Sequence, residues 1–154
     1  MVIRLAEPEQ WGAVISAAAE IFENEQQIPR ALNPIPAELS PRWWCAEEDG
    51  VILGTLAAYF TSGQCHVGRL TVSPSCRGCG LGGKLLQHAL EELFSQGVPE
   101  VYADARDQAV RLLCRLGGQV TGPGVPFYVG NVTPVLVKKE DFTPVFEYNT
   151  KEFN

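Results

Sequence analysis

The sequence predicts one α/β domain of the α+β type, with a mixed, mostly antiparallel sheet of about seven strands flanked by helices. Three consecutive strand-like segments joined by short turns favour antiparallel pairing. The remaining chain alternates helical and strand-like segments and ends in an expected hairpin. With 154 residues, 45% of them apolar, the chain has room for one substantial core and little room for a second.

The N-terminal part is expected to hold an edge strand, a helix and an irregular segment. Val2–Leu5 has strand character, and the helix starts after Glu7–Pro8, because proline is tolerated in a first helical turn. An apolar stripe at helical spacing follows: Trp11, Val14, Ile15, Ala18, Ile21 and Phe22. Repeated prolines make Gln27–Pro41 irregular, with a short turn at Ala37–Leu39 at most, and suit this segment to a pocket wall.

Three antiparallel strands are expected next: Trp43–Glu48, Val51–Thr61 and Cys65–Val72. Asp49–Gly50 is a turn dipeptide, since both positions tolerate a positive φ, and residues 62–64 form the second turn. Because neighbouring strand residues face opposite ways, one of Trp43 and Trp44 is expected in the core and the other at the surface.

The C-terminal half combines two helices with a short strand and a hairpin. The first helix carries apolar residues on one face: Leu81, Leu85, Leu86, Ala89, Leu90, Leu93 and Phe94. A strand at Val101–Ala103, a helix at Asp107–Leu116 and a hairpin of Gln119–Val129 with Val132–Lys138 are expected after it. We expect residues 1–138 to form the domain and residues 139–154 to be a C-terminal tail of the same domain, without assigned structure.

Composition excludes several classes of protein. Twelve basic against eighteen acidic residues give a net charge of −6, the opposite of what binding to nucleic acid needs. No apolar run approaches the roughly 20 residues of a membrane span, and residues 1–4 do not resemble a signal peptide. We therefore expect a cytoplasmic protein with no nucleic-acid or membrane partner.

The cysteines are expected to behave as small apolar residues. Their number, five, is odd, and Cys76 and Cys79 form a lone CxxC with only two histidines elsewhere in the chain. A zinc site lacks an obvious ligand set, and a redox site would need the CxxC to open a helix just after a strand. No metal is therefore expected.

The chemistry is expected in the glycine-rich segment Arg77–Lys84, between a strand and a helix. Glycines let backbone N–H groups face an anion without an intervening Cβ. The following helix adds its unpaired amides, and Arg77 and Lys84 supply local positive charge to an acidic protein. The segment therefore predicts a phosphate cradle.

Three motifs compete for this segment. Gly78, Gly80 and Gly83 fit the dinucleotide fingerprint GxGxxG, but five residues separate Val72 from Gly78, and one strand–helix–strand unit is available. A P-loop would need a hydroxyl residue after Lys84, where Leu85 stands. The third motif is Arg77-x-x-Gly80-x-Gly82 after an apolar strand.

On this third motif the chain resembles the GNAT superfamily of acetyl-CoA-dependent N-acetyltransferases, whose signature is [QR]xxGxG/A before a long helix. Asp107–Gly117 is similar to the family's NxxAxxxYxxxGF helix. Ile21–Pro29 and Phe127–Gly130 resemble the VFxxEQ segment and the last hairpin of the ElaA-like branch. The resemblance covers nearly all of residues 2–138 and implies a GNAT-like fold.

The resemblance implies acetyl-CoA as cosubstrate and direct attack of an amine on the thioester in a ternary complex. By position, the diphosphate would be bound by Arg77, Gly78, Cys79, Gly80, Leu81, Gly82 and Gly83. The pantetheine arm would pair with Leu70, Thr71 and Val72, as an exposed strand edge allows.

The chain departs from the family where a proton donor is usual. Leu113 stands at the position of the general-acid tyrosine, Arg106 at that of the asparagine and Gly118 at that of the GF phenylalanine. Cys114 and Tyr128 are the nearest alternative acids. Either one of these protonates the thiolate, or the thiolate leaves unassisted.

Three residues are candidate catalytic bases. His66 lies six residues before Val72, and because strand side chains alternate between two faces, both are expected on the same face. Glu25 is expected at the end of the first helix, beside the substrate wall. Tyr128 is expected in the last hairpin. A water relay without a single base also fits.

The expected function is acetyl transfer to a primary amine. The acceptor would be a small molecule or a peptide, and the net charge favours a cationic one by weak steering. A non-catalytic acyl-CoA-binding or regulatory module is the alternative, motivated by Leu113, with a dinucleotide-dependent oxidoreductase third. The edge strand makes a homodimer possible.

Overall fold

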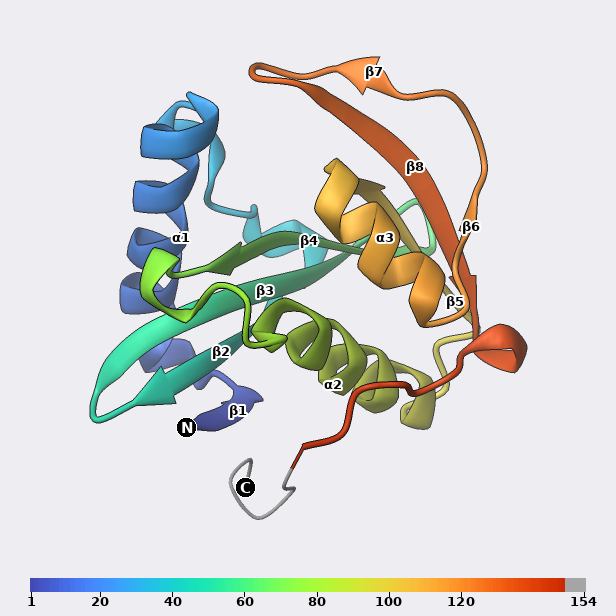
Figure 1. The fold of residues 1–154 in the computed structure, drawn as a ribbon, viewed down its shortest axis with the longest axis horizontal. Helices are drawn as coiled ribbons and strands as arrows, with labels where there is room; N and C mark the ends of the chain where they lie inside the picture. The colour runs from blue at the N-terminus through green and yellow to red at the C-terminus, as the bar shows by residue number, and fades with distance from the viewer. Residues whose placement is uncertain (149–154) are drawn as a thin grey trace.

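The computed structural model describes residues 1–148 and consists of a twisted mixed sheet with helices on both faces (Figure 1). The sheet contains β1 (Val2–Leu5), β2 (Arg42–Glu48), β3 (Val51–Thr61), β4 (Gln64–Val72), β5 (Glu100–Ala105), β6 (Gln119–Val120), β7 (Val125–Pro126) and β8 (Asn131–Lys138). Its order is β1-β2-β3-β4-β5-β8-β6, with β7 paired to β8. Within the described chain β4 and β5 form the single parallel pair. The predicted mixed, mostly antiparallel sheet is confirmed, with β1 at its edge.

The first helix, α1 (Trp11–Gln26), follows a short 3-10 turn at Pro8–Gln10. Glu7 and Gln10 form a capping box that satisfies N–H groups at this start. The helix ends where Gln27 adopts a left-handed conformation with φ 56°. The proline-rich segment beyond it is irregular as expected, with 3-10 turns at Arg30–Leu32 and Ala37–Leu39.

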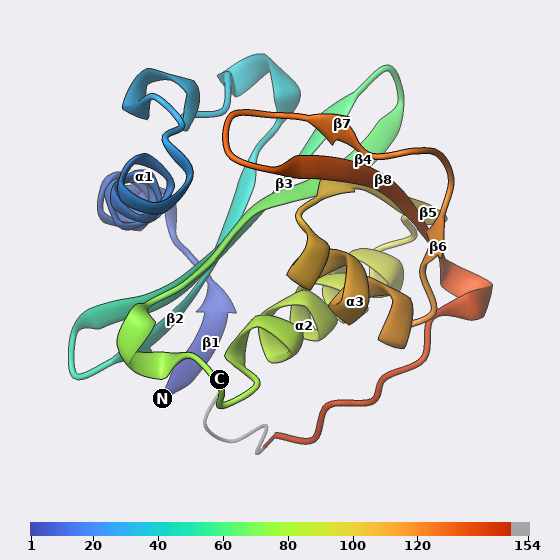
Figure 2. The same cartoon turned by 45° about the horizontal axis from the view of Figure 1, so that its top comes forward.

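The two faces of the sheet carry separate apolar cores. α1 packs on one face over Trp43, and α2 (Leu81–Ser95) and α3 (Asp107–Arg115) pack on the other face, over Trp44 (Figure 2). Both tryptophans are therefore buried, with 1% and 0% exposure. The expectation that one of them is exposed was wrong, because helices cover both faces of β2.

The expected first arm of the C-terminal hairpin was also wrong. In place of one strand from residue 119 to residue 129, the chain forms only the two-residue strands β6 and β7. Residues 122–124 are Gly-Pro-Gly, and proline cannot donate a ladder hydrogen bond, so pairing with β8 is interrupted there. These two short strands bring the sheet to 8 strands.

Residues 139–148 pack back against α2 and α3. The side-chain oxygen of Gln87 accepts hydrogen bonds from the amides of Val145 and Phe146, at 2.9 and 2.8 Å, and its nitrogen donates to the Phe146 carbonyl. Arg115 lies over the Phe146 ring at 4.7 Å. Residues 149–154 of the expected tail lie outside the described residues. Over residues 1–148, no helix has the length and apolar character that crossing a membrane requires.

Candidate functional site

The sheet opens between β4 and β5. These two strands pair only at Cys65 with Val101 and at His66 with Tyr102, although β4 continues to Val72 and β5 to Ala105. Beyond the paired residues, the β4 edge that faces β5 forms no further ladder with it. The sheet therefore offers main-chain donors and acceptors of β4 at the opening.

A β-bulge in β4 lies at the opening. The register shifts between Ala57, which pairs with Gly68, and Thr55, which pairs with Thr71. Arg69 lies inside this bulge with φ 58°, a conformation that costs a residue other than glycine roughly 1–2 kcal/mol. The extra residue reverses which face each later side chain of β4 points to.

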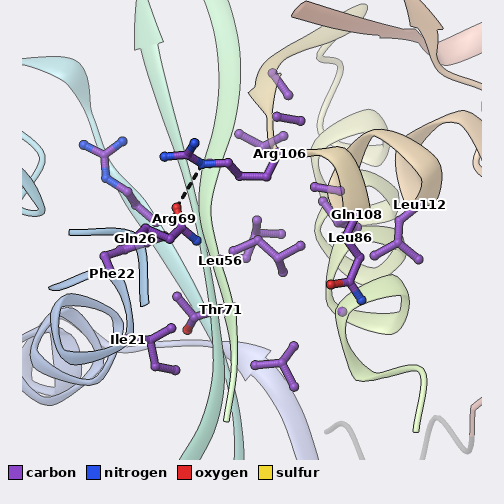
Figure 3. A pocket seen from close by; sticks show the side chains of 18 of the residues that line it. Ile21, Phe22, Gln26, Leu56, Arg69, Thr71, Leu86, Arg106, Gln108 and Leu112 are labelled. Atoms are coloured by element: carbon purple, nitrogen blue, oxygen red, sulfur yellow. Dashed lines mark hydrogen bonds between the residues drawn. The ribbon is translucent and has the colours of Figure 1, made fainter. Parts of the chain in front are cut away.

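A cavity of about 680 Å³ occupies the opening (Figure 3). It is lined by the last two turns of α1, the segment after it, β3, β4, the glycine-rich loop, the first turns of α2, β5, α3 and the last hairpin. Of the residues predicted to bind the cofactor, it is lined by Leu70, Thr71, Val72, Arg77, Gly78, Gly80, Leu81, Gly82 and Gly83. Cys79 is not part of this lining; its thiol donates to the carbonyl of Cys76 at 2.6 Å.

The glycine-rich loop presents open backbone to the cavity. Gly78 and Gly80 have φ values of 86° and 80°, and Gly80 is the N-cap of α2. A Cβ would meet nothing within 4 Å at Gly78, and at Gly80 only the end of Lys84 at 4.0 Å. The space in front of these peptide groups is therefore free for a ligand, and the amides of the first turn of α2 have no helical acceptor. This is the chemistry that a diphosphate needs.

Arg77 and Glu25 meet at this loop. Nη2 of Arg77 donates to both carboxylate oxygens of Glu25, at 2.7 and 2.8 Å, and its Nε donates to the Val72 carbonyl at 3.2 Å. Both side chains are partly exposed. Glu25 thus lies at the cavity as expected from the sequence, but its oxygens bind Arg77.

The face of β4 expected for His66 was wrong. Cys65 and Val67 belong to the core under α2, and after the bulge Leu70 and Val72 pack against that same core. His66 therefore lies on the opposite face, stacked on Tyr59 at 5.3 Å and beside Tyr102 at 5.5 Å.

The environment of His66 favours the neutral ring. Burial lowers the pKa of His66 below 6.5, and the Asp104 carboxylate opposes that shift. Its Nε2 is buried without a hydrogen-bond partner among residues 1–148. His66 is not among the cavity-lining residues.

The remaining candidates for proton transfer do not line the cavity. Tyr128 is 50% exposed, and its neighbour Phe127 lines the cavity instead. Cys114 is exposed, whereas Leu113 is buried and lines the cavity. At the position of the family tyrosine the wall is therefore apolar.

Two arginines that sequence reasoning did not assign to the site also line the cavity. They are Arg69, in the bulge, and Arg106, the N-cap of α3. The sequence could have indicated Arg106, because a basic residue between a predicted strand and a predicted helix often lies at the edge of a sheet where ligands bind. No comparable signal marked Arg69, because the bulge that orients it leaves no pattern in the sequence.

Within the described residues, no group of three or more His, Cys, Asp and Glu side chains could hold a metal ion. All five cysteines are free thiols.

Comparison with known proteins finds matches over most of the chain. A model described as the acetyltransferase (GNAT) family matches residues 11–117. Among solved structures, Escherichia coli ElaA matches with a TM-score of 0.75 at 16% identity, over 86% of this chain and 93% of its own. Salmonella typhimurium yncA, solved with its cofactor acetyl-CoA, matches with a TM-score of 0.69 at 22% identity, over 96% and 99%.

An acyl-CoA N-acyltransferase from Pseudomonas aeruginosa matches with a TM-score of 0.72 at 21% identity, over 86% of this chain and 92% of its own. At these identities the three structures establish a shared fold. No curated protein matches the chain.

Proposed function

The chain belongs to the acetyltransferase (GNAT) family, and from that premise we propose that it transfers the acetyl group of acetyl-CoA to a primary amine by direct attack in a ternary complex. One observation carries the proposal: the open glycine-rich loop and the unpaired edge of β4 line the same cavity. A diphosphate and an amide-bearing arm of one ligand can therefore be bound together. The structure of yncA with acetyl-CoA supports this choice of cosubstrate.

We assign cofactor binding to two sets of groups. The amides from Gly78 to Gly82, with the positive end of α2, would bind the diphosphate, because Gly78 and Gly80 face free space just before the helix start. The main chain of Leu70–Val72 would bind the pantetheine arm by strand-like hydrogen bonds. Acetyl-CoA, when bound, supplies an activated thioester.

The protein's own contribution is to hold the two substrates together and keep the reacting groups oriented. Glu25 lines the cavity, but Arg77 occupies its oxygens, so we assign Glu25 to positioning the loop. His66 and Tyr128 do not line the cavity. We therefore propose that the ammonium loses its proton to water before attack, and that the thiolate leaves without a side-chain acid, since Leu113 offers no proton.

Steady-state release of free thiol from acetyl-CoA across a panel of primary amines tests this function. We expect release that depends on the amine and exceeds the rate without amine. Tight acetyl-CoA binding with no thiol release on any amine would instead identify a non-catalytic acyl-CoA-binding module.

Melting temperatures with CoA and with NAD test the dinucleotide alternative, because a ligand that binds the native state raises its melting temperature. We expect a rise with CoA and none with NAD.

A further inference from the structure

Arg69 is held at the cavity by backbone contacts that carry no charge. Its Nε donates to the Asn33 carbonyl at 3.2 Å and its Nη2 to the Leu32 carbonyl at 3.3 Å. The guanidinium also lies 6.0 Å from the Tyr59 ring. Together these contacts fix a cation in a left-handed bulge position that an arginine rarely occupies.

Arg106 is held at the same cavity from the other side of the opening. Its Nε donates to Oε1 of Gln26 at 2.9 Å, its Nη1 donates to the Val129 carbonyl, and its guanidinium lies 5.4 Å from the Phe127 ring. Its Nη2 is buried and has no hydrogen-bond partner among residues 1–148. Burial lowers the pKa of this guanidinium, which still carries its charge near neutral pH.

These two cations lack anionic partners. Arg77, on the same cavity, pairs with Glu25, whereas neither Arg69 nor Arg106 has a carboxylate oxygen within ion-pair distance in the described chain. Figure 3 shows both side chains extending toward the same end of the cavity, with Arg106 bonded to Gln26. A partly buried guanidinium with a free N–H matches a carboxylate in geometry and charge. Two of them at one end form a local positive site in a chain of net charge −6.

Around these cations the lining is apolar and accessible. Leu32 and Phe127 are 49% and 40% exposed, and Ile28 also lines the cavity. Asp104 also lines the cavity and adds one negative charge beside His66. The end of the cavity at Arg69 and Arg106, which we call the acceptor end, therefore combines two cations, one carboxylate and an apolar wall. This combination complements a zwitterion with an apolar side chain.

On the basis of the proposed function, we infer that the acetyl acceptor is a small amino carboxylic acid with an apolar side chain, whose carboxylate is bound by Arg69 and Arg106. The apolar side chain contacts Leu32 and Phe127. The bound carboxylate fixes the orientation of the amine relative to the β4 edge. The site thus requires an anionic group on the acceptor, which revises the cationic acceptor expected from net charge alone.

Matched acceptors test this inference. The assay is thiol release from acetyl-CoA. L-leucine and L-phenylalanine are compared with their carboxamides, in which the carboxylate is neutralised, and with isoamylamine and phenethylamine, in which it is absent. We expect the acids to have kcat/KM values about 10- to 100-fold above those of the matched amides and amines, the range for a hydrogen-bonded charge. Arg69→Gln and Arg106→Gln should each lower the kcat/KM of the acids toward that of their matched amides, so that the preference for the acids is lost. Arg111→Gln, an exposed arginine on α3 that does not line the cavity, is the control and should behave as wild type.

Binding of N-acetyl-L-leucine and N-acetyl-L-phenylalanine to the CoA-bound protein, measured by calorimetry, separates this inference from the proposed activity. If both arginine variants bind these N-acetyl amino acids more weakly than wild type, and no amine causes thiol release in the assay above, the carboxylate site is supported and the activity is overturned. Equal turnover of acids, amides and amines would support the activity and overturn the site. An equal loss of CoA affinity in both arginine variants would assign the arginines to the cofactor and also overturn the inference.

Discussion

Nη2 of Arg77 lies 2.7 and 2.8 Å from the two carboxylate oxygens of Glu25, and this pair joins the glycine-rich loop to the last turn of α1. The two residues are 52 positions apart in the sequence. α1 leads directly into the segment that carries Ile28 and Leu32 on the acceptor end of the cavity. The pair therefore fixes the glycine-rich loop relative to the segment that carries Ile28 and Leu32.

Glu25→Gln keeps an oxygen that accepts a hydrogen bond from Arg77 and so keeps the loop in place, and it should tighten CoA binding and leave turnover unchanged. The substitution removes a negative charge beside the diphosphate site, and an exposed charge of this kind contributes roughly 0.2–1 kcal/mol. We expect the CoA dissociation constant to fall about two- to fivefold by calorimetry. If Glu25 were the general base, kcat would instead fall by about 10²–10⁴. Glu23→Gln is the matched control, because Glu23 pairs with Arg30 away from the cavity.

His66→Phe should leave kcat and the pH dependence of kcat/KM close to wild type. The phenylalanine ring keeps the stack on Tyr59 and Tyr102 while removing the imidazole, which could accept a proton. The β4 bulge places this ring on the face opposite Val72, outside the cavity lining. Loss of the acidic limb of the pH profile, together with a fall in kcat of about 100-fold or more, would identify His66 as the base after all.

The same variant should change how stability depends on pH. The pKa of His66 in the folded chain lies below its value of 6.5 in the unfolded chain, because burial disfavours the charged ring. Between these two values the unfolded chain binds more protons, so stability falls as pH falls below about 6.5. The wild-type melting temperature should therefore drop more than that of His66→Phe from about pH 7.5 to about pH 5.5. Parallel pH curves for the two proteins would contradict this account.

Gly83→Ala should destabilise the fold through the C-terminal segment. A Cβ at Gly83 would overlap the ring of Phe146, and overpacking of this kind costs about 1–3 kcal/mol. Phe146→Ala removes the ring, so the alanine at residue 83 should cost less in the double variant. Denaturant unfolding of the four proteins in the cycle measures the coupling between the two residues. Additive effects would show that the ring does not pack there in solution.

Local patterns predicted most of the elements. The apolar spacing from Leu81 to Phe94 has the period of a helix, and Asp49–Gly50 is a favoured hairpin-turn dipeptide, so α2 and the β2–β3 hairpin could be predicted directly. The glycines of the loop also follow from local chemistry, since φ values of 86° and 80° at Gly78 and Gly80 suit glycine.

Features that depend on how one strand pairs with the next could not be predicted. One extra residue at Arg69 reverses the faces of β4, and it placed His66 opposite the expected side. The separation of β4 and β5 is a tertiary property, because neither strand shows in its own sequence where pairing with the other ends. Arg69 and Arg106 become neighbours of one cavity only through that separation.

Main-chain amides from Gly78 to Gly82 are proposed to bind the diphosphate of CoA, and calorimetric titration of Gly80→Glu with CoA is the sharpest test of this assignment. The glutamate would place a side chain and a negative charge in the open space before the loop. Gly63→Glu is the control: its φ of 76° imposes similar backbone strain, in an open turn that does not line the cavity. We predict at least about 100-fold weaker CoA binding in Gly80→Glu, about 2.7 kcal/mol, and wild-type affinity in Gly63→Glu. Wild-type CoA affinity in a folded Gly80→Glu protein would contradict the assignment.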